Sequence, residues 1–155
     1  MAGCTTGEEA YSIAMILKEF FDQNAVHPEV QIFATDLDER AINIARTGVY
    51  SQGIVADVAS PRLERYFTFK KDHFHINKRI RDMIVFAVQD LTADPPFLNL
   101  GLIICRNLLI YMNSTLQQRV LPMFHYILKH DGLLLLGPSE ILGNCDYMYR
   151  TLDRK

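Results

Sequence analysis

The chain opens with Ala2-Gly3-Cys4-Thr5-Thr6-Gly7-Glu8-Glu9 and passes directly into a segment of strong helical periodicity. Over positions 10–21 the apolar residues recur at intervals of three and four, which places them on one face of an α-helix. Gly3 and Gly7 have no Cβ, so their backbone N–H groups can come close to a ligand. A glycine loop that leads into a helix is typical of α/β folds that bind nucleotides and related cofactors.

The same stretch carries two signals in its side chains. Thr6 and Glu9 have the S/T-x-x-E spacing of a capping box, which predicts that the helix begins here. Glu8 and Glu9 place carboxylates where a phosphate-binding loop would have neutral or basic residues. The loop therefore favours a ligand that carries positive charge.

Length and composition narrow the class of protein. The 155 residues, 49% of them hydrophobic, suffice for one domain with one core. A formal net charge of −2 provides no basic field for nucleic acid. No apolar run reaches the ~20 residues of a membrane span, and no signal-peptide pattern opens the chain. Cys4, Cys105 and Cys145 have no metal-ligand spacing, as expected in a reducing cytoplasm. The composition predicts a cytoplasmic α/β domain with no nucleic-acid partner, membrane insertion or metal.

Strands and helices alternate along the rest of the chain. Apolar runs predict buried strands at 30–35, 83–88, 100–105 and 133–136. Helices are predicted over 39–47, where Asp38 can cap the first turn, and over 114–129. Strands that alternate with helices imply a largely parallel sheet with right-handed crossovers.

The segment 67–76 alternates around Lys71-Asp72 and predicts a small surface hairpin. His73 and His75 lie on one face of it at a spacing that can ligate a metal, but no cysteine or acid pattern completes a site. We therefore favour a solvated strand face for both histidines. Basic residues make the region locally positive, which suits a solvated face or an acidic protein partner: Lys70, Lys71, Lys78, Arg79 and Arg81.

Polar residues follow the predicted strands at the edge where an open parallel sheet binds ligands. They are Asp36, Asp90, Arg106, Asn107, Tyr111, Ser139 and Glu140. Asp36 directly follows the strand at 30–35, where a carboxylate can accept hydrogen bonds from both hydroxyls of a ribose. The same residue could equally cap a loop, and the pattern alone leaves both roles open.

The loop also excludes several classes of nucleotide. The chain has no Gly-x-x-x-x-Gly-Lys-Ser/Thr sequence, which disfavours a phosphate-gripping NTPase. The spacing Gly3-x-x-x-Gly7 differs from Gly-x-Gly-x-x-Gly, and Glu8 and Glu9 would repel a pyrophosphate. S-adenosylmethionine fits better, because it has a ribose for Asp36, no phosphate, and positive ammonium and sulfonium groups.

Several segments occur together in a characteristic order: Ala2–Ser12, Ala34–Asp38, Arg65–Phe67, Cys105–Tyr111 and Leu136–Glu140. In this combination the chain resembles the chemotaxis receptor methyltransferases of the CheR family over nearly its whole length. The first and fourth of these segments are the most specific. The run 88–97 is most similar to versions fused to methylesterase and sensory-kinase modules.

The resemblance implies a fold, a reaction and partners. The fold would be the Rossmann-like sheet of an S-adenosylmethionine-dependent methyltransferase over 1–155, with an inserted small β-subdomain at about 67–80. The reaction would transfer a methyl group from S-adenosylmethionine to glutamate side chains on the cytoplasmic helices of chemotaxis receptors, in chemosensory adaptation, with S-adenosylhomocysteine as product. The acceptor carboxylate is already ionised at pH 7, so this reaction needs no general base.

Roles for individual residues follow from the same resemblance. Glu9 would hold the methionine ammonium, and Asp36 would hold the ribose. Arg106 and Tyr111 would be the catalytic pair facing the methyl group and the substrate carboxylate, which a planar guanidinium and a hydroxyl are suited to orient. The loop, the Asp90-Leu91 pair that would flank the adenine and the residues after the strand at 100–105 complete the cofactor-binding set: Gly3, Thr5, Gly7, Asp90, Leu91, Arg106 and Asn107.

We expect the sequence to be one part of a longer polypeptide. Only Met1 and Ala2 precede Gly3, where the fold would have a strand, and another strand is expected beyond Lys155. The first and last strands of the sheet would then be missing, which would leave backbone groups of their neighbours unpaired.

Two other functions stay open. One is a non-catalytic S-adenosylmethionine-binding or docking module of a signalling protein, and the other is a methyltransferase for another substrate. Gly101 stands where the family commonly has aspartate, which favours the docking module. Retention of Arg106 and Tyr111 favours the enzyme.

Overall fold

The computed structural model describes residues 1–152, which form two compact units. The α1 unit comprises Cys4–Val88, and the α5 unit comprises Met1–Gly3 together with the chain from Gln89 to position 152. The chain passes from one unit to the other after Gly3 and again after Val88. Within the described residues, no helix is long and apolar enough to cross a membrane.

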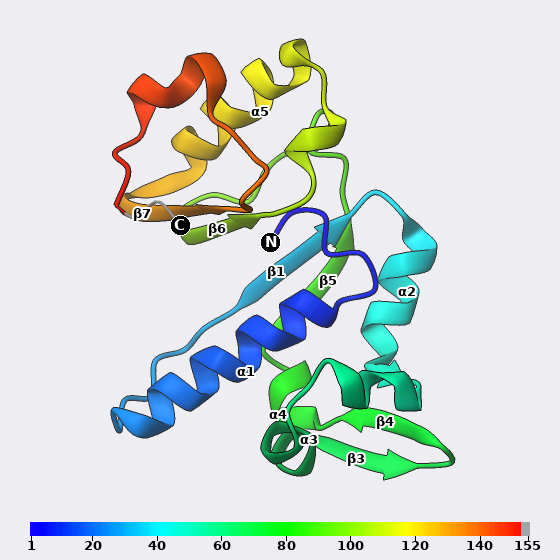
Figure 1. The fold of residues 1–155 in the computed structure, drawn as a ribbon. Helices are drawn as coiled ribbons and strands as arrows, with labels where there is room; N and C mark the ends of the chain where they lie inside the picture. The colour runs from blue at the N-terminus through cyan, green and yellow to red at the C-terminus, as the bar shows by residue number, and fades with distance from the viewer. Residues whose placement is uncertain (153–155) are drawn as a thin grey trace. The chain divides into compact units, whose positions relative to one another are not determined.

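The α1 unit is built on a parallel pair of strands. Its elements are α1 (Glu8–Gln23), β1 (Ile32–Asp36), α2 (Glu39–Thr47), β2 (Val49–Tyr50), η1 (Gln52–Ala56), α3 (Ser60–Tyr66), β3 (Phe67–Lys70), β4 (His73–Ile76), α4 (Lys78–Arg81) and β5 (Ile84–Val88). β1 and β5 pair in parallel, with Ile32 opposite Ile84 and Asp36 opposite Val88. Both α1 and α2 pack against these strands (Figure 1). The buried residues of this unit include Tyr11, Ala14, Ala34, Ile42, Ile80 and Phe86.

Helix α2 has the bounds that its capping residue predicts. The Asp38 carboxylate accepts hydrogen bonds from the backbone N–H groups of Arg40 and Ala41, which have no partner within the helix. The helix ends at Gly48, whose φ of 60° lies in the left-handed region that favours glycine. Cap and stop are both local signals, so the sequence was sufficient to predict this element.

The predicted hairpin is present and belongs to a three-stranded sheet. β3 and β4 pair antiparallel, and Lys71 and Asp72 between them have φ values of 47° and 61°. Positive φ at both central residues is typical of the tight turns that join twisted strands. The third strand, β2, pairs antiparallel with β4 and was not predicted, because two residues are too few to show an alternating pattern.

The α5 unit contains the second parallel pair. Its elements are β6 (Leu100–Cys105), η2 (Leu109–Tyr111), α5 (Ser114–Ile127), β7 (Leu128–Leu136) and η3 (Gly143–Met148). β6 and β7 pair in parallel, and Ala2 forms a parallel bridge to Cys105, with its N–H donating to the Ile104 carbonyl over 2.9 Å. α5 packs against β7 (Figure 1). The buried core of this unit consists of Ala2, Ile103, Cys105, Leu109, Val120, Leu121, Phe124, Ile127 and Cys145.

Parallel pairing is thus confirmed, whereas the bounds of β7 differ from the prediction. The helix expected over 114–129 ends at Ile127, and the strand expected at 133–136 begins at Leu128. Leu128 pairs with Leu100, and a register shift follows before Leu133 pairs with Leu102. The four residues that the shift absorbs, 129–132, have no apolar pattern by which a strand could be predicted.

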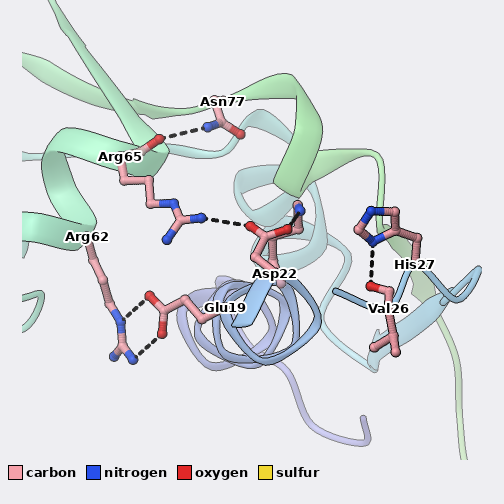
Figure 2. A network of polar contacts seen from close by, with 8 residues as sticks. Glu19, Asp22, Val26, His27, Arg62, Arg65 and Asn77 are labelled. Carbon is pink, nitrogen blue, oxygen red and sulfur yellow. Dashed lines mark hydrogen bonds and ion pairs between the residues drawn. The ribbon is translucent and has the colours of Figure 1, made fainter. Parts of the chain in front are cut away.

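Ion pairs join α3 to α1 (Figure 2). The Arg62 guanidinium donates to Glu19 through Nε at 2.9 Å and Nη2 at 2.7 Å, a bidentate geometry that fixes both side chains. Arg65 Nη2 donates to Asp22 Oδ2 at 2.7 Å, and Lys18 also pairs with Asp22. These contacts tie α3, which leads directly into β3, to the C-terminal half of α1.

We expect the Glu19→Gln variant to lose stability in a way that depends on pH. The hydrogen bond from Arg62 lowers the pKa of Glu19 in the folded protein, so the ionised pair stabilises the fold above the ordinary glutamate pKa of about 4.3 and loses its effect as pH falls through the folded pKa. The pair is partly exposed, so the loss is at most about 1 kcal/mol. Thermal unfolding between pH 3 and 7 measures it.

Glu64→Gln, at an exposed position of the same helix α3, is the matched control and should leave the unfolding temperature unchanged. A difference between wild type and Glu19→Gln that is equally large at pH 3 and pH 7 would contradict an electrostatic role for Glu19.

Candidate functional site

Gly7 is the residue on which the conformation of the loop depends. It precedes the first helical residue of α1 with a φ of 91°, in the left-handed region that other residues rarely adopt. A Cβ at this position would lie 2.9 Å from the Ala45 Cβ and 3.1 Å from Cε1 of Phe86. Both the left-handed backbone conformation and the close packing against Ala45 and Phe86 therefore require glycine at position 7.

The capping box predicted at the start of α1 is wrong. Gly7 is the N-cap and has no side chain to accept a hydrogen bond. The hydroxyl of Thr6 instead donates to the carboxylate of Glu8, at 2.8 Å and 2.7 Å from its two oxygens. The first turn consequently presents two carboxylates, Glu8 and Glu9, which are stabilised by the positive end of the helix dipole.

Asp36 connects the end of β1 to the glycine loop. Its Oδ2 accepts the Thr5 backbone N–H at 2.8 Å, and its Oδ1 accepts the Asp38 N–H at 3.0 Å. The loop-capping role that the sequence left open is therefore present. Each carboxylate oxygen has a second lone pair, so a half-buried carboxylate held by two backbone donors can still accept hydrogen bonds from a ligand.

Aromatic residues support the loop, and sequence reasoning missed the most important of them. The Tyr50 hydroxyl donates to the Thr6 carbonyl at 3.0 Å, and its ring packs edge-to-face on Tyr11 with centroids 6.0 Å apart. The Tyr11 hydroxyl donates to the Ala45 carbonyl at 2.8 Å. Burial raises the pKa of Tyr11 to about 12 and also raises the pKa of Tyr50, so both hydroxyls remain donors at neutral pH.

The thiol of Cys4, inside the loop, is unreactive at neutral pH. Its side chain is buried, and burial together with the nearby charge of Asp36 raises its pKa to about 12. The thiolate is the nucleophilic form of cysteine, and it is scarcely populated at neutral pH. Cys4 therefore fills space in the loop.

In the α5 unit, Asp90 uses its side chain to shape its own loop. Its Oδ1 accepts both the backbone N–H and the hydroxyl of Thr92, each at 2.7 Å, and these bonds lower the pKa of Asp90. The Asp90 N–H donates to Asp94 Oδ2 at 2.8 Å. Leu91 is partly buried against the core of the unit. These hydrogen bonds hold the backbone groups of the loop in fixed directions. Such a loop suits the adenine contact expected of Asp90 and Leu91, if that contact is made largely through the backbone.

Arg106, Asn107 and Tyr111 belong to the loop that follows β6. Asn107 has a φ of 53°, and the Tyr111 N–H donates to the Leu108 carbonyl at 3.1 Å. The amide of Gln117 on α5 supports the same turn by donating to the carbonyls of Leu109 at 2.9 Å and Met112 at 3.2 Å. The Tyr111 side chain is 81% exposed and Arg106 is exposed, so both can reach an incoming macromolecule.

The predicted site residues fall into two groups, one in each unit. The α1 unit carries Thr5, Gly7, Glu9 and Asp36, and the α5 unit carries Gly3, Asp90, Leu91, Arg106, Asn107 and Tyr111. Direct contact is seen between Thr5 and Asp36. The described part of the chain contains no group of three or more His, Cys, Asp or Glu side chains that could hold a metal ion.

Comparison with known families gives a single clear answer. The model of the CheR methyltransferase SAM-binding domain matches residues 1–155, the whole chain. The chain belongs to the CheR methyltransferase family. A SAM-binding domain of this family implies a Rossmann-like fold, in agreement with the parallel strand pairs and the helices packed on them.

Relatives of the CheR domain come from several bacteria. The chain is 43% identical over 141 residues to an uncharacterized 104.1 kDa protein of Rhodobacter capsulatus, covering 91% of the chain and 15% of that protein. It is 35% identical over 158 residues to a putative methyltransferase of Pseudomonas putida, covering 97% of the chain and 56% of that protein. It is 35% identical over 152 residues to a chemotaxis protein methyltransferase of Borreliella burgdorferi, covering 96% of the chain and 54% of that protein. The chain thus spans about half the length of the two methyltransferases.

We expect Gly7→Ala to destabilise this CheR domain by about 1–3 kcal/mol, because alanine must adopt the left-handed conformation and its Cβ meets Ala45 and Phe86. Urea unfolding measures the change. Gly53→Ala is the matched control: its Cβ would lie 3.5 Å from Ser51 Oγ, an ordinary contact, and stability should stay within about 0.5 kcal/mol. Equal unfolding midpoints for the two variants would contradict the requirement for glycine at position 7.

Proposed function

We propose that this chain is the S-adenosylmethionine-binding catalytic domain of a protein-glutamate O-methyltransferase that modifies chemoreceptors in the cytoplasm. The observation that carries the proposal is the CheR family match over the whole chain, combined with Arg106 and Tyr111 exposed on one loop after a parallel strand. Relatives named chemotaxis protein methyltransferases support the same reaction.

The residues of the α1 unit fit the proposed cofactor. The carboxylates of Glu8 and Glu9 on the first turn of α1 suit a ligand with ammonium and sulfonium charges and do not suit a phosphate. Asp36 is already oriented by the Thr5 and Asp38 N–H groups and has acceptor capacity left for ribose hydroxyls. Gly7 gives the loop its left-handed turn into α1 and packs closely against Ala45 and Phe86, which fixes the position of the first helical turn that carries Glu8 and Glu9. We assign the methionine ammonium to Glu9 and the ribose to Asp36.

When bound, S-adenosylmethionine supplies an electrophilic methyl group. The tasks of the chain are then to orient the acceptor and to exclude water. The Arg106 guanidinium presents a planar fork that matches a carboxylate, and the Tyr111 hydroxyl can orient one carboxylate oxygen. The acceptor glutamate is ionised at pH 7, so no side chain needs to remove a proton. Positioning of this kind can contribute about 7–11 kcal/mol to lowering a barrier.

The proposed substrate is a glutamate on the cytoplasmic helices of a chemoreceptor. The hairpin of β3 and β4 exposes Lys70 and Lys71, and helix α4 after it exposes Arg79 and Arg81, while Lys78 of the same helix pairs with Asp82 at 2.6 Å. This positive surface suits a protein partner rich in glutamate. Methylesterase or sensory-kinase modules, as in fusion proteins of the family, are proposed as further parts of the same polypeptide.

Cofactor binding is the first test. Calorimetric titration of the protein with S-adenosylhomocysteine should show binding, and Asp36→Asn should weaken it about ten- to hundredfold, because an amide NH2 replaces one charged acceptor. Asp57→Asn, at an exposed position after η1, is the matched control and should bind as wild type does. Unchanged binding by Asp36→Asn would remove Asp36 from the cofactor site.

The second test separates chemistry from binding. Arg106→Ala should reduce the rate of methyl transfer to receptor far more than it reduces affinity for S-adenosylhomocysteine, because its main task is to orient the acceptor. Transfer of radiolabelled methyl groups to receptor-containing membranes measures the rate. Equal losses of rate and affinity would make Arg106 a cofactor ligand only. Binding of S-adenosylhomocysteine by wild type without any transfer would favour the docking module.

A further inference from the structure

Glu140 is a buried carboxylate to which the proposed reaction assigns no role. It lies in the turn after β7, where its N–H donates to the Gly137 carbonyl at 3.2 Å, and the residue is only 8% exposed. Oε1 accepts the backbone N–H of Leu108 at 3.0 Å. Oε2 is buried and has no hydrogen-bond partner in the described structure. An incompletely paired buried carboxylate is costly, so its presence calls for an explanation.

Gly137 is shaped to admit this carboxylate. A Cβ on Gly137 would lie 2.3 Å from Glu140 Oε2, closer than non-bonded atoms can approach, and 3.4 Å from the Arg106 Cβ. The absence of a side chain at 137 therefore allows the Glu140 side chain to fold back over its own turn, beside the backbone that carries Arg106. The conformation of the Glu140 side chain therefore depends on glycine at position 137.

Leu108, the partner of Glu140, lies between the proposed catalytic residues. It follows Arg106 and Asn107, and its carbonyl accepts the Tyr111 N–H at 3.1 Å. Its side chain lies 3.4 Å from where a Cβ of Gly3 would be, so it is close to the first glycine of the loop. The hydrogen bond at the Leu108 N–H thus holds the peptide between Asn107 and Leu108, inside the loop that begins at Arg106 and ends at Tyr111.

We propose that Glu140 is a positioning residue for methyl transfer: it holds the loop 106–111 through the Leu108 N–H, with Gly137 providing the space for its carboxylate. The proposal rests on the proposed function, because it concerns the loop that carries Arg106 and Tyr111. Glu140 does not touch the substrate. It acts by keeping the guanidinium and the phenol in the arrangement that orients the acceptor.

The test compares variants of the whole protein by two readouts. Glu140→Asp has a side chain one methylene shorter, which withdraws the carboxylate from Leu108, and Gly137→Ala displaces the same carboxylate without changing it. Glu140→Gln retains an acceptor oxygen at the original reach. Gly101→Ala, whose Cβ would meet nothing within 4 Å, is the matched control. The readouts are methyl-transfer kinetics and amide hydrogen exchange at Leu108 and Tyr111.

We expect Glu140→Asp and Gly137→Ala to accelerate exchange at Leu108 and to lower kcat about a hundredfold, with the KM for S-adenosylmethionine changed less than about threefold. Glu140→Gln should lose less than about tenfold in kcat, since a neutral acceptor makes a weaker bond. Gly101→Ala should match wild type. Global unfolding of each variant, measured in parallel, separates a local change in the loop from loss of the fold.

Three results would overturn the proposal. Unchanged Leu108 exchange in Glu140→Asp would show that the carboxylate does not hold the loop. Accelerated exchange with wild-type kcat would show that the loop position does not matter for transfer. A kcat for Glu140→Gln as low as that for Glu140→Asp would show that the charge acts directly. If wild type transfers no methyl group to receptor, the proposed function fails, and the exchange data alone then decide whether Glu140 holds the loop.

Discussion

The left-handed glycine at position 7 is the constraint on which the α1 unit depends. With a φ of 91° and contacts to Ala45 and Phe86 that leave no room for a Cβ, Gly7 turns the chain from the loop into α1. The turn brings the Thr5 N–H within 2.8 Å of Asp36 and the Thr6 carbonyl within 3.0 Å of the Tyr50 hydroxyl. A side chain at position 7 would disturb these bonds together, because they all depend on the same backbone path.

Elements defined by local signals could be predicted from the sequence. Asp38 and Gly48 supply a cap and a stop for α2, and its predicted bounds agree with the structure. The predictions were wrong where the existence or the bounds of an element depend on a neighbouring strand or on the backbone path of a loop. β2 exists because β4 pairs with it, and β7 extends to Leu128 because its register shifts against β6. The Thr6–Glu9 capping box failed because the glycine that the loop requires also occupies the N-cap.

The candidate site likewise contains residues that the sequence suggests and residues that only the structure reveals. The cofactor contacts assigned to the glycine loop and to the acids after strands stay predictions, made from residue types that have a chemical meaning in the sequence itself. The residues that hold the loops in place were not predictable. Tyr50 supports the loop from 44 residues away, and Glu140 reaches Leu108 across 32 residues. No periodicity or motif links such pairs, since they are brought together only by the completed fold of each unit.

The chemistry proposed for this domain makes its supporting residues unusually important. A carboxylate acceptor is ionised without help, so the protein gains little from a group that moves protons and much from groups that fix angles and distances. In the proposed reaction Arg106 would have to orient the acceptor carboxylate without pairing with it so tightly that the carboxylate loses nucleophilicity, a balance that depends on the position of the guanidinium. The position of the guanidinium depends in part on the backbone of the loop that carries it, and ordering that loop before the substrate arrives reduces the entropy cost of binding. The Leu108 N–H bond to Glu140 and the Gln117 bonds to the following turn hold this backbone, so under the proposed function residues that do not touch the substrate would contribute to the rate.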